Sequence, residues 1–184
     1  MVLLNSPICD HQKIMPKFEL MNIDGSIWKS KDLVGISGTL VMFICNHCPY
    51  VKAVIDKIVE TTIALEKLNI KSIAIMPNDT ETYPEDGFEN MKIFANKHRF
   101  NFPYLIDKTQ EISREFGAVC TPDFFGFNSD NKLNYRGRKG LMNNLQFTGK
   151  TNELLDAMKQ IAKVGEGPGE QFSSAGCSIK WKTN

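Results

Sequence analysis

A buried-strand pattern, two cysteines and the start of a helix follow one another in the first third of the chain. The continuous apolar run over 40–44 is typical of a strand buried on both faces. Cys45 and Cys48 come next, and apolar residues then recur at helical spacing. Pro49 fits the first turn of a helix, because the N–H groups there have no intrahelical partner. The sequence therefore predicts a strand that delivers Cys45 to the N-terminus of a helix spanning about 49–68.

This placement favours redox chemistry at the two cysteines. A helix N-terminus carries a partial positive charge and free N–H groups, which favour a thiolate, and the thiolate is the nucleophile in thiol–disulfide exchange. We predict that Cys45 attacks, that Cys48 resolves the mixed disulfide, and that His47 stabilises the thiolate by charge or hydrogen bond. We also expect Cys45 to be more exposed than Cys48, with a pKa below the ordinary ~8.5.

The same spacing is compatible with two other interpretations of the cysteines. They could be small buried apolar residues, or they could form half of a zinc site. A structural zinc site usually shows a second pair of cysteine or histidine ligands in the sequence, and this chain has no second pair of that kind.

Length and composition indicate one domain, residues 1–184, large enough to bury a core without covalent staples. A net charge of +1 gives no reason to expect nucleic acid or an anionic membrane as a partner. No apolar run approaches the ~18 residues of a membrane helix, and the first ten residues lack the features of a signal peptide. We therefore expect a cytoplasmic protein, in which the five cysteines are thiols and not a disulfide framework.

The remaining periodicities predict alternating strands and helices. Asp24-Gly25 between two short segments predicts a hairpin over 18–28. A second buried strand at 70–76 should run parallel to the first, because a helix lies between them. The other expected elements are a helical turn at 30–33, helices at about 87–98, 107–116 and 151–163, and strands at 103–106 and 132–136.

The two ends of the chain carry weaker signals. Residues 1–16 show no regular pattern, and we expect a leader lying on the surface. Residues 165–184 begin with a glycine-rich break but contain the apolar Trp181, which favours a docked tail. Thr151 is the expected N-cap of the last helix. Residues 137–150 have no strand or helix pattern and are expected to form a loop.

Polar residues at the end of the second strand are candidates for substrate contacts. In an open α/β sheet the carboxyl ends of the strands line the site, so Asn78 and Asp79 should emerge beside Cys45. A polar loop that only caps the next turn is the alternative. Asn46, between the two cysteines, is a further candidate for binding substrate.

A proline at the start of an aromatic strand marks a third segment of the site. Proline is confined to strand edges or first positions, and it is the residue that forms a cis bond at modest cost. A cis Thr121–Pro122 bond would turn the backbone of residues 120–121 outward, where it could pair with an extended substrate that carries a thiol. We therefore predict that Cys120, Thr121 and Pro122 bind substrate beside the cysteines.

These motifs together resemble the thioredoxin fold and, within it, the peroxiredoxin-like branch of the alkyl hydroperoxide reductase/thiol-specific antioxidant (redoxin) family. The resemblance covers about residues 16–182. The phrases that narrow it are Cys45-Asn-His-Cys-Pro49, Asn78-Asp79, Tyr83-Pro-Glu-Asp86, Cys120-Thr-Pro-Asp-Phe-Phe125 and Gly176-Cys-Ser-Ile-Lys-Trp181. It implies an α/β, three-layer α/β/α fold with a mixed central sheet of four or five strands, an N-terminal β-hairpin and a C-terminal tail. It also implies a redox-active Cys45 and no cofactor.

The chain departs from the related proteins at two positions. True peroxiredoxins carry Pro-x-x-x-Thr/Ser-x-x-Cys before the peroxide-reacting cysteine. Here the residues before Cys45 are Met42, Phe43 and Ile44, so the hydroxyl that would activate a bound peroxide is missing. Thioredoxin has Gly-Pro between its cysteines, whereas a histidine before the second cysteine is similar to the disulfide-oxidase branch.

Three functions remain open from the sequence. The leading one is a dithiol–disulfide oxidoreductase that acts on protein or small-molecule thiols and disulfides and is reset by an upstream thiol reductant. The second is an antioxidant thiol peroxidase, in which Cys45 reacts with peroxide and Cys48, Cys120 or Cys177 resolves. The third is a metal-binding or chaperone-like protein without turnover, in which Cys45, His47, Cys48 and one further ligand hold zinc or copper(I).

Overall fold

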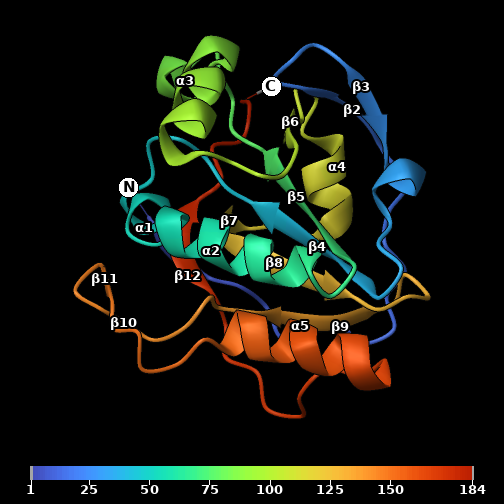
Figure 1. Cartoon of the computed structure of the whole chain (residues 1–184). Helices are drawn as coiled ribbons and strands as arrows, with labels where there is room; N and C mark the ends of the chain where they lie inside the picture. Colours follow the sequence, from blue (N-terminus) through green and yellow to red (C-terminus); the bar gives the residue numbers. More distant parts are fainter. Residues whose placement is uncertain (1, 184) are drawn as a thin grey trace.

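A seven-stranded mixed sheet, in the order β3-β2-β6-β5-β4-β8-β9, forms the centre of the computed structural model, which describes residues 2–183 (Figure 1). The strands are β2 (Glu19–Asn22), β3 (Ile27–Lys29), β4 (Gly38–Phe43), β5 (Ile70–Met76), β6 (Tyr104–Ile106), β8 (Asp123–Phe127) and β9 (Leu133–Gly137). β4, β5 and β6 run parallel, and the other pairings are antiparallel. The expected four or five strands are too few, because the hairpin β2–β3 pairs with β6 and extends the sheet.

Helices cover both faces of this sheet, as expected for a three-layer α/β/α fold. They are α1 (Pro49–Lys52), α2 (Ile55–Glu66), α3 (Phe88–His98), α4 (Glu111–Phe116) and α5 (Glu153–Val164), with 3-10 turns η1 (Ser30–Leu33) and η2 (Pro84–Asp86). Alternate residues of β4 supply the two cores. Leu40 and Met42 pack with α2, α3 and α5, whereas Val41 and Phe43 pack with Phe116 of α4.

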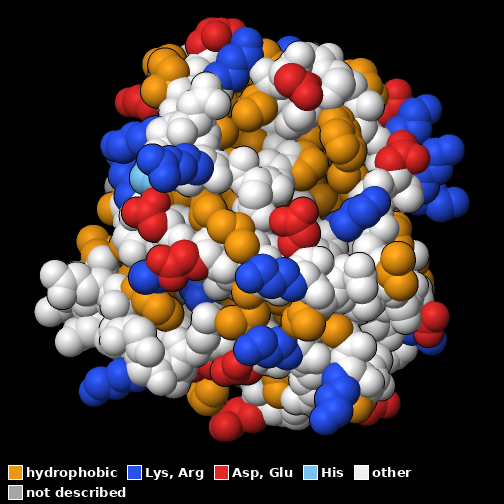
Figure 2. Space-filling model, in the orientation of Figure 1, with side chains coloured by type: hydrophobic (Ala, Val, Ile, Leu, Met, Phe, Trp, Pro, Cys, Tyr) orange, Lys and Arg blue, Asp and Glu red, His pale blue; other side chains and the backbone are white. Residues whose placement is uncertain are grey.

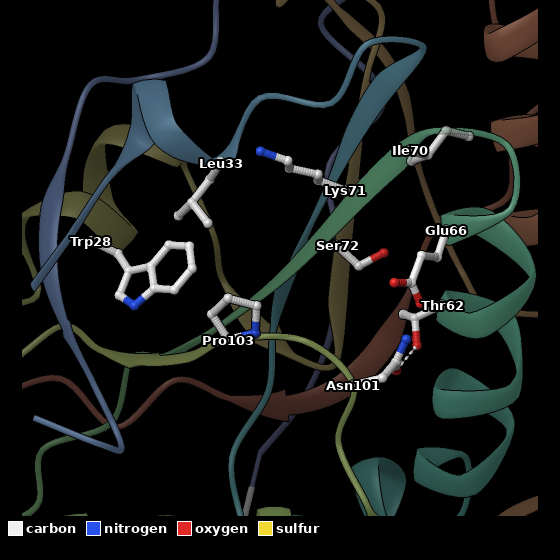
Figure 3. A pocket seen from close by; sticks show the side chains of 9 residues that line it. All are labelled: Trp28, Leu33, Thr62, Glu66, Ile70, Lys71, Ser72, Asn101 and Pro103. Atoms are coloured by element: carbon white, nitrogen blue, oxygen red, sulfur yellow. Dashed lines mark hydrogen bonds between the residues drawn. The ribbon is translucent and has the colours of Figure 1, made fainter. Parts of the chain in front are cut away.

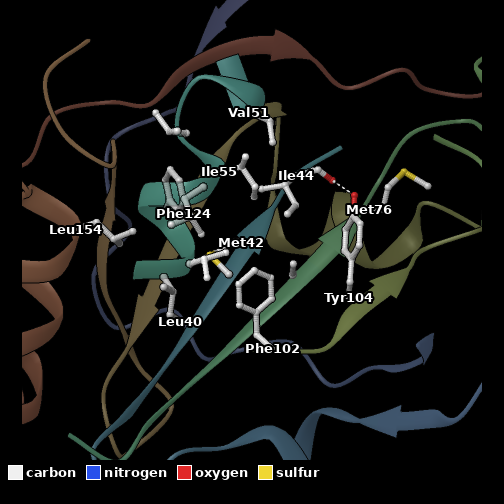
Figure 4. Packing of buried hydrophobic residues seen from close by; sticks show 14 of the residues in the cluster. Leu40, Met42, Ile44, Val51, Ile55, Met76, Phe102, Tyr104, Phe124 and Leu154 are labelled. Carbon is white, nitrogen blue, oxygen red and sulfur yellow. Dashed lines mark hydrogen bonds between the residues drawn. The ribbon is translucent and has the colours of Figure 1, made fainter. Parts of the chain in front are cut away.

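Figure 4 shows the first of these cores, in which Met42 and Ile44 lie among side chains of α2 and β8. Cys45, Cys48 and Cys177 belong to the same buried cluster. The sulfur atoms therefore lie inside the hydrophobic interior and not on its rim.

Helix boundaries differ from the sequence-based expectation at three places. The helix expected over 49–68 is split into α1 and α2, because Val54 has a φ of −123°, outside the helical range. The helix expected at 107–116 begins only at Glu111. The last helix is capped by Asn152, whose side chain accepts from the backbone N–H of Leu155, whereas Thr151 accepts from Leu141 instead.

A second, three-stranded sheet joins both ends of the chain to the segment before Pro122. It has the order β1-β12-β7 and consists of β1 (Leu3–Asn5), β12 (Ala175–Ser178) and β7 (Cys120–Thr121). The irregular leader expected near the N-terminus therefore contains a strand. Figure 1 shows β12 running between β7 and the beginning of the chain.

The last part of the tail packs onto α4 and the loop before it. The guanidinium carbon of Arg114 lies 4.2 Å from the centre of the Trp181 ring, and the backbone N–H of Lys182 donates to Gln110 over 2.7 Å. The expected loop at 137–150 contains a two-stranded ribbon formed by β10 (Met142–Asn143) and β11 (Gln146–Phe147).

Charged side chains of both signs are interspersed over the face drawn in Figure 2. The three basic residues Arg136, Arg138 and Lys139 do not form a solvated surface patch. Arg136 and Lys139 are buried, and Arg138 pairs with Glu153 at 2.7 Å. Among residues 2–183, no helix combines the length and the apolar character needed to cross a membrane.

Candidate active site

The two cysteines of the motif lie between the end of β4 and the start of α1. β4 ends at Phe43 and α1 begins at Pro49, with Cys48 as its N-cap. Both Cys45 and Cys48 are fully buried, so the expectation that Cys45 is the more exposed is wrong. The predicted path from a buried strand through the cysteines into a helix is present.

Thr121 contacts both cysteines. Its Oγ1 lies 3.2 Å from Cys45 Sγ, and its carbonyl oxygen lies 3.1 Å from Cys48 Sγ. The Thr121–Pro122 bond is cis, as predicted, and it lies against the cysteine motif. One residue therefore contacts both sulfurs, through its hydroxyl at Cys45 and its backbone carbonyl at Cys48.

Cys177 is the third cysteine of this cluster. The sequence suggested it only as a resolving cysteine for the peroxidase alternative. Its Sγ lies 2.8 Å from Cys48 Sγ. It reaches this position because β12 pairs with β7, with Cys177 directly opposite Thr121. No two of the five cysteines, all of which lie among the described residues, are joined in a disulfide.

The ionisation of the cysteine pair differs from the expectation. The hydrogen bond from Cys45 is the main factor that lowers the pKa of Cys48, to about 5, with further hydrogen bonds from Cys177 and the backbone of Val51. The pKa of Cys45 is raised well above its ordinary value, because its thiol donates to Cys48 and is buried. Cys48, and not Cys45, is the N-cap residue of α1, so Cys48 is the cysteine nearer to the first N–H groups of the helix.

His47 is paired with a carboxylate that the sequence did not single out as a site residue. His47 Nδ1 lies 2.6 Å from Asp86 Oδ2, and this hydrogen bond is the main factor that raises the pKa of His47. Although burial of Asp86 acts in the other direction, hydrogen bonds from His47 and Asn78 hold the pKa of Asp86 below its ordinary value. Asp86 comes from η2, in the phrase Tyr83-Pro-Glu-Asp86, and sequence spacing alone gave it no role.

Asp86 also fixes the backbone of the motif. Its Oδ1 accepts from the N–H of Asn46 at 2.7 Å and from that of His47 at 3.2 Å, and Asn78 donates to Oδ2 at 2.7 Å. The amide side chain of Asn46 accepts from Tyr104 at 3.0 Å. Asn46 and Asn78 therefore belong to a network that holds the loop between the cysteines, and their contact with substrate stays a prediction.

Asp79 and Cys120 lie beside the site without entering its network. Asp79 accepts from Thr82 at 2.6 Å and from the N–H of Glu81, which is the capping role given above as the alternative. Cys120 Sγ lies 3.7 Å from the carbonyl oxygen of Pro122, and burial raises its pKa. Neighbouring strand residues point to opposite faces, so Cys120 is directed away from the cysteine motif that Thr121 contacts.

Metal ligation by this cluster competes with existing hydrogen bonds. Ligand atoms of Cys45, His47 and Asp86 lie within 4.8 Å of one another. Both carboxylate oxygens of Asp86, however, already accept from the groups of Asn46, His47 and Asn78 described above. The residues present therefore form a satisfied polar network around a sulfur pair.

Two hollows of the surface differ in their relation to the cysteines. One of about 530 Å³ is lined by Asn46 and His47 and also carries Lys52, Lys97 and Glu85. The other, of about 340 Å³, lies around the beginning of β5 and contains Trp28, Ser72 and Asn101 (Figure 3). Because β4 and β5 are parallel, the second hollow is at the end of the sheet opposite the cysteines.

Comparison with solved structures supports the fold and finds two full-length relatives. An uncharacterized conserved protein from Geobacillus kaustophilus is 37% identical, with a TM-score of 0.94 over 100% of this chain and 98% of that chain. A hypothetical protein from Sinorhizobium meliloti 1021 is 26% identical, with a TM-score of 0.91 over 98% and 99%. The thioredoxin domain of a thiol-disulfide oxidoreductase from Bacteroides vulgatus is 12% identical, with a TM-score of 0.63 over 85% and 99%, and shows the fold alone.

A comparison with curated protein sequences found no match. The model of the AhpC/TSA family matches residues 12–136, which span the cysteine motif and the Thr121–Pro122 turn. The chain therefore has a thioredoxin-like fold and belongs to the AhpC/TSA (redoxin) family.

Proposed function

We propose that this protein is a dithiol–disulfide oxidoreductase whose redox pair is Cys45 and Cys48. The observation that carries the proposal is the contact of Thr121 with both sulfurs, through its hydroxyl at Cys45 and its carbonyl at Cys48. Such an arrangement holds two thiols at a helix start, where one of them ionises readily. The substrates are protein or small-molecule disulfides, and an upstream dithiol resets the pair.

The reaction consists of two exchanges. Cys45 passes its proton to the Cys48 thiolate and attacks a substrate disulfide, so that a Cys45–substrate disulfide forms and one substrate sulfur leaves as a thiolate, which takes a proton from water. Cys48 then attacks Cys45 Sγ, which forms the Cys45–Cys48 disulfide and releases the second substrate thiol with the proton from Cys48. Two electrons have moved from the pair to the substrate. Cys45 is assigned the attack because Cys48 Sγ is already in contact with Cys177 Sγ.

His47 and Asp86 support this cycle from the side of the loop. An imidazolium close to the sulfurs stabilises the thiolate by charge, and Asp86 keeps the imidazole protonated to higher pH. The hollow beside Asn46 and His47 gives a substrate a place to approach the motif. The mixed charge of that hollow, with two lysines and a glutamate, is suited to a polar peptide segment.

The other two functions have less support. The strand before Cys45 supplies no hydroxyl for a bound peroxide, because Met42, Phe43 and Ile44 occupy those positions. A metal would have to displace the hydrogen bonds that Asp86 accepts. Hydrogen peroxide consumption and metal content are therefore measured alongside the main assay.

The test is reduction of insulin disulfides in the presence of a dithiol reductant. We expect the wild-type protein to accelerate the reaction and both C45S and C48S to lose the acceleration. The matched control is C9S, because Cys9 is also buried but lies in the core on the opposite face of the sheet. C48S should in addition accumulate a mixed disulfide at Cys45, since the resolving thiol is missing.

Three results would contradict the proposal. Insulin reduction that persists in C45S would show that Cys45 is not the attacking thiol. Consumption of hydrogen peroxide without insulin reduction would favour the peroxidase, and stoichiometric zinc or copper in the purified protein would favour the metal-binding alternative.

A further inference from the structure

We propose that Cys177 is a third redox-active cysteine, which takes over the disulfide of the motif by forming a bond with Cys48. The proposal rests on the function proposed above, because the disulfide that is passed on is the one made by Cys45 and Cys48. It assigns a chemical role to the C-terminal tail.

The first support is the register of the tail strand. β12 pairs antiparallel with β7, and Cys177 is directly opposite Thr121. Directly opposed residues of antiparallel strands project their side chains to the same face. Thr121 contacts Cys45 and Cys177 contacts Cys48, so this cross-strand pair meets both sulfurs of the motif.

The second support is the distance between the sulfur atoms. Cys177 Sγ lies 2.8 Å from Cys48 Sγ, whereas a disulfide bond is about 2.05 Å long, so the atoms need to move by less than about 1 Å. The two residues are 129 positions apart in the chain. A contact between cysteines so far apart in the sequence depends on the tertiary fold and not on a local sequence pattern.

The third support is the close approach of the backbone of β12, at Gly176, to the backbone of Thr121 and Pro122. A Cβ on Gly176 would lie 2.2 Å from the carbonyl oxygen of Thr121 and 3.0 Å from the nitrogen of Pro122. Only glycine permits this approach. The tail therefore occupies the backbone position beside Pro122 that was expected to receive an extended substrate, and it brings its own thiol there.

The other two cysteines do not share this geometry. Cys120 lies on the strand paired with β12, but its sulfur contacts the carbonyl oxygen of Pro122. Cys9 lies in the core on the other face of the sheet. Among the described contacts, Cys177 is thus the cysteine outside the motif whose sulfur touches a sulfur of the motif.

The transfer is a balanced disulfide exchange. The Cys177 sulfur attacks Cys48 Sγ, the Cys48–Cys177 bond forms, the Cys45–Cys48 bond breaks, and the proton of Cys177 ends on Cys45. No external oxidant or reductant takes part. In the reduced protein, burial and the hydrogen bond to Cys48 raise the pKa of Cys177 to about 12. The contribution from the Cys48 thiolate disappears once Cys48 is in a disulfide, which favours ionisation of Cys177 at that stage.

The exchange has a defined result for the site. Cys45 becomes a thiol again while the oxidising equivalent is kept between Cys48 and the tail. The protein therefore holds two alternative disulfides, and a reductant that reaches the tail strand can reset the site without contacting Cys45.

Trypsin makes the alternatives easy to separate. Cys45 and Cys48 lie together on peptide 32–52, Cys177 lies on 164–180, Cys120 on 115–132, and Cys9 on 1–13. The Cys45–Cys48 disulfide is therefore internal to one peptide, whereas the Cys48–Cys177 disulfide links two. Full-length protein is oxidised with oxidised glutathione, blocked with N-ethylmaleimide, digested and analysed by mass spectrometry.

The decisive variant is C45S, in which Cys48 is left with Cys177. We expect C45S to yield peptide 32–52 linked to 164–180, and C45S/C177A to lose this product. C45S/C120A is the matched control and should keep it. In the wild type, the linked peptides should carry N-ethylmaleimide on Cys45, and C177A should contain only the disulfide internal to 32–52.

The outcomes separate this proposal from the one on which it rests. If wild-type protein reduces insulin and forms the internal disulfide, but folded C45S gives no link to 164–180, the role of Cys177 is wrong and the oxidoreductase stands. If C45S forms the link but the wild type has no insulin-reducing activity, the oxidoreductase is wrong and Cys177 forms only a structural disulfide. A wild-type link in which Cys45 is never alkylated also overturns the transfer.

Discussion

His47 Nδ1 lies 2.6 Å from Asp86 Oδ2, so the loop between the two cysteines carries one half of an ion pair whose other half comes from η2. The pairing raises the pKa of His47 and so favours the charged imidazole close to the sulfurs. Asp86 also accepts hydrogen bonds from the backbone N–H groups of Asn46 and His47, which donate to no other group among the described hydrogen bonds. Charge and loop geometry therefore depend on the same carboxylate.

Replacing His47 by alanine should make the Cys45–Cys48 couple more reducing and raise the pKa of the thiolate sulfur. The reason is that an imidazolium stabilises the reduced, thiolate form relative to the disulfide. Each unit by which the thiolate pKa rises lowers the reduction potential by about 30 mV. Equilibration with glutathione buffers measures the potential.

The matched control for His47 is H98A. His98 Nδ1 makes a comparable contact of 2.7 Å with Asp56, yet no described contact joins His98 to a cysteine. An unchanged potential and thiolate pKa in H47A, equal to those of H98A, would mean that His47 does not tune the site.

The contribution of the His47–Asp86 pair to stability should depend on pH. The folded-state pKa of His47 is raised above 6.5, so its contribution is complete below about pH 6.5 and is lost as pH rises through the folded pKa. The folded-state pKa of Asp86 is lowered below 3.8, so its contribution is present above about pH 3.8 and is lost as pH falls through the folded pKa. The pair therefore stabilises most between these limits.

Urea unfolding of the wild type and H47Q measures this effect. The difference in unfolding free energy between them should be larger near about pH 5.5 than near about pH 9. The comparison of two proteins is needed because the lowered pKa of Cys48 has the opposite effect on stability. The hydrogen bonds that lower this pKa, from Cys45, Cys177 and the backbone of Val51, are kept in H47Q, so most of that effect cancels in the difference. A difference that is constant over this range would show that folding does not raise the pKa of His47.

Removing the hydroxyl of Thr121 should raise the pKa of Cys45 further. The hydrogen bond of this hydroxyl is the factor that lowers the pKa of Cys45, in opposition to Cys48 and burial. Hydrogen bonds to charged groups contribute about 1.5–3 kcal/mol, so T121V should shift the pKa by about one to two units. T121S keeps the hydroxyl and should behave as the wild type. The measurement is the rate of Cys45 alkylation against pH, read from peptide 32–52. Equal profiles for T121V and T121S would remove this role.

Gly176→Ala should lift the tail strand away from the site. The added Cβ would lie 2.2 Å from the carbonyl oxygen of Thr121, which is backbone and has little freedom to move. Overpacking of this kind costs about 1–3 kcal/mol of stability, and the cysteines should become more open to alkylation. The control is G169A, because a Cβ on Gly169 meets nothing within 4 Å. Denaturant unfolding and the alkylation rate of Cys177 measure both effects, and equal results for the two variants would contradict the close approach.

Local patterns in the sequence were sufficient for the scaffold and for two parts of the site. The apolar run, the cysteine spacing and Pro49 are contiguous, and they predicted the junction of β4 and α1. Thr121–Pro122 was predicted as a cis bond beside the cysteines because proline restricts the backbone locally. Signals of this kind depend only on residues that are adjacent in the sequence, so they can be interpreted without knowledge of the fold.

The rest depends on contacts between distant segments. Asp86 reaches the loop from 39 positions away and Cys177 reaches Cys48 from 129, and neither spacing has a local signature. The expectation that Cys45 has the lowered pKa was wrong for a related reason. The sequence placed both cysteines near a helix start, but the N-cap residue is Cys48. A shift of three positions was enough to move the thiolate from one sulfur to the other.

Cys45, Cys48 and Cys177 are members of the main hydrophobic core, so the oxidation state of the protein is also a state of its packing. A disulfide replaces thiols by another apolar group of similar size and leaves the core closed. Oxidation of a thiol to a sulfinic acid instead introduces a charge among aliphatic and aromatic side chains, where no water can solvate it. Over-oxidation of these buried cysteines is therefore expected to destabilise the fold as well as to stop the chemistry.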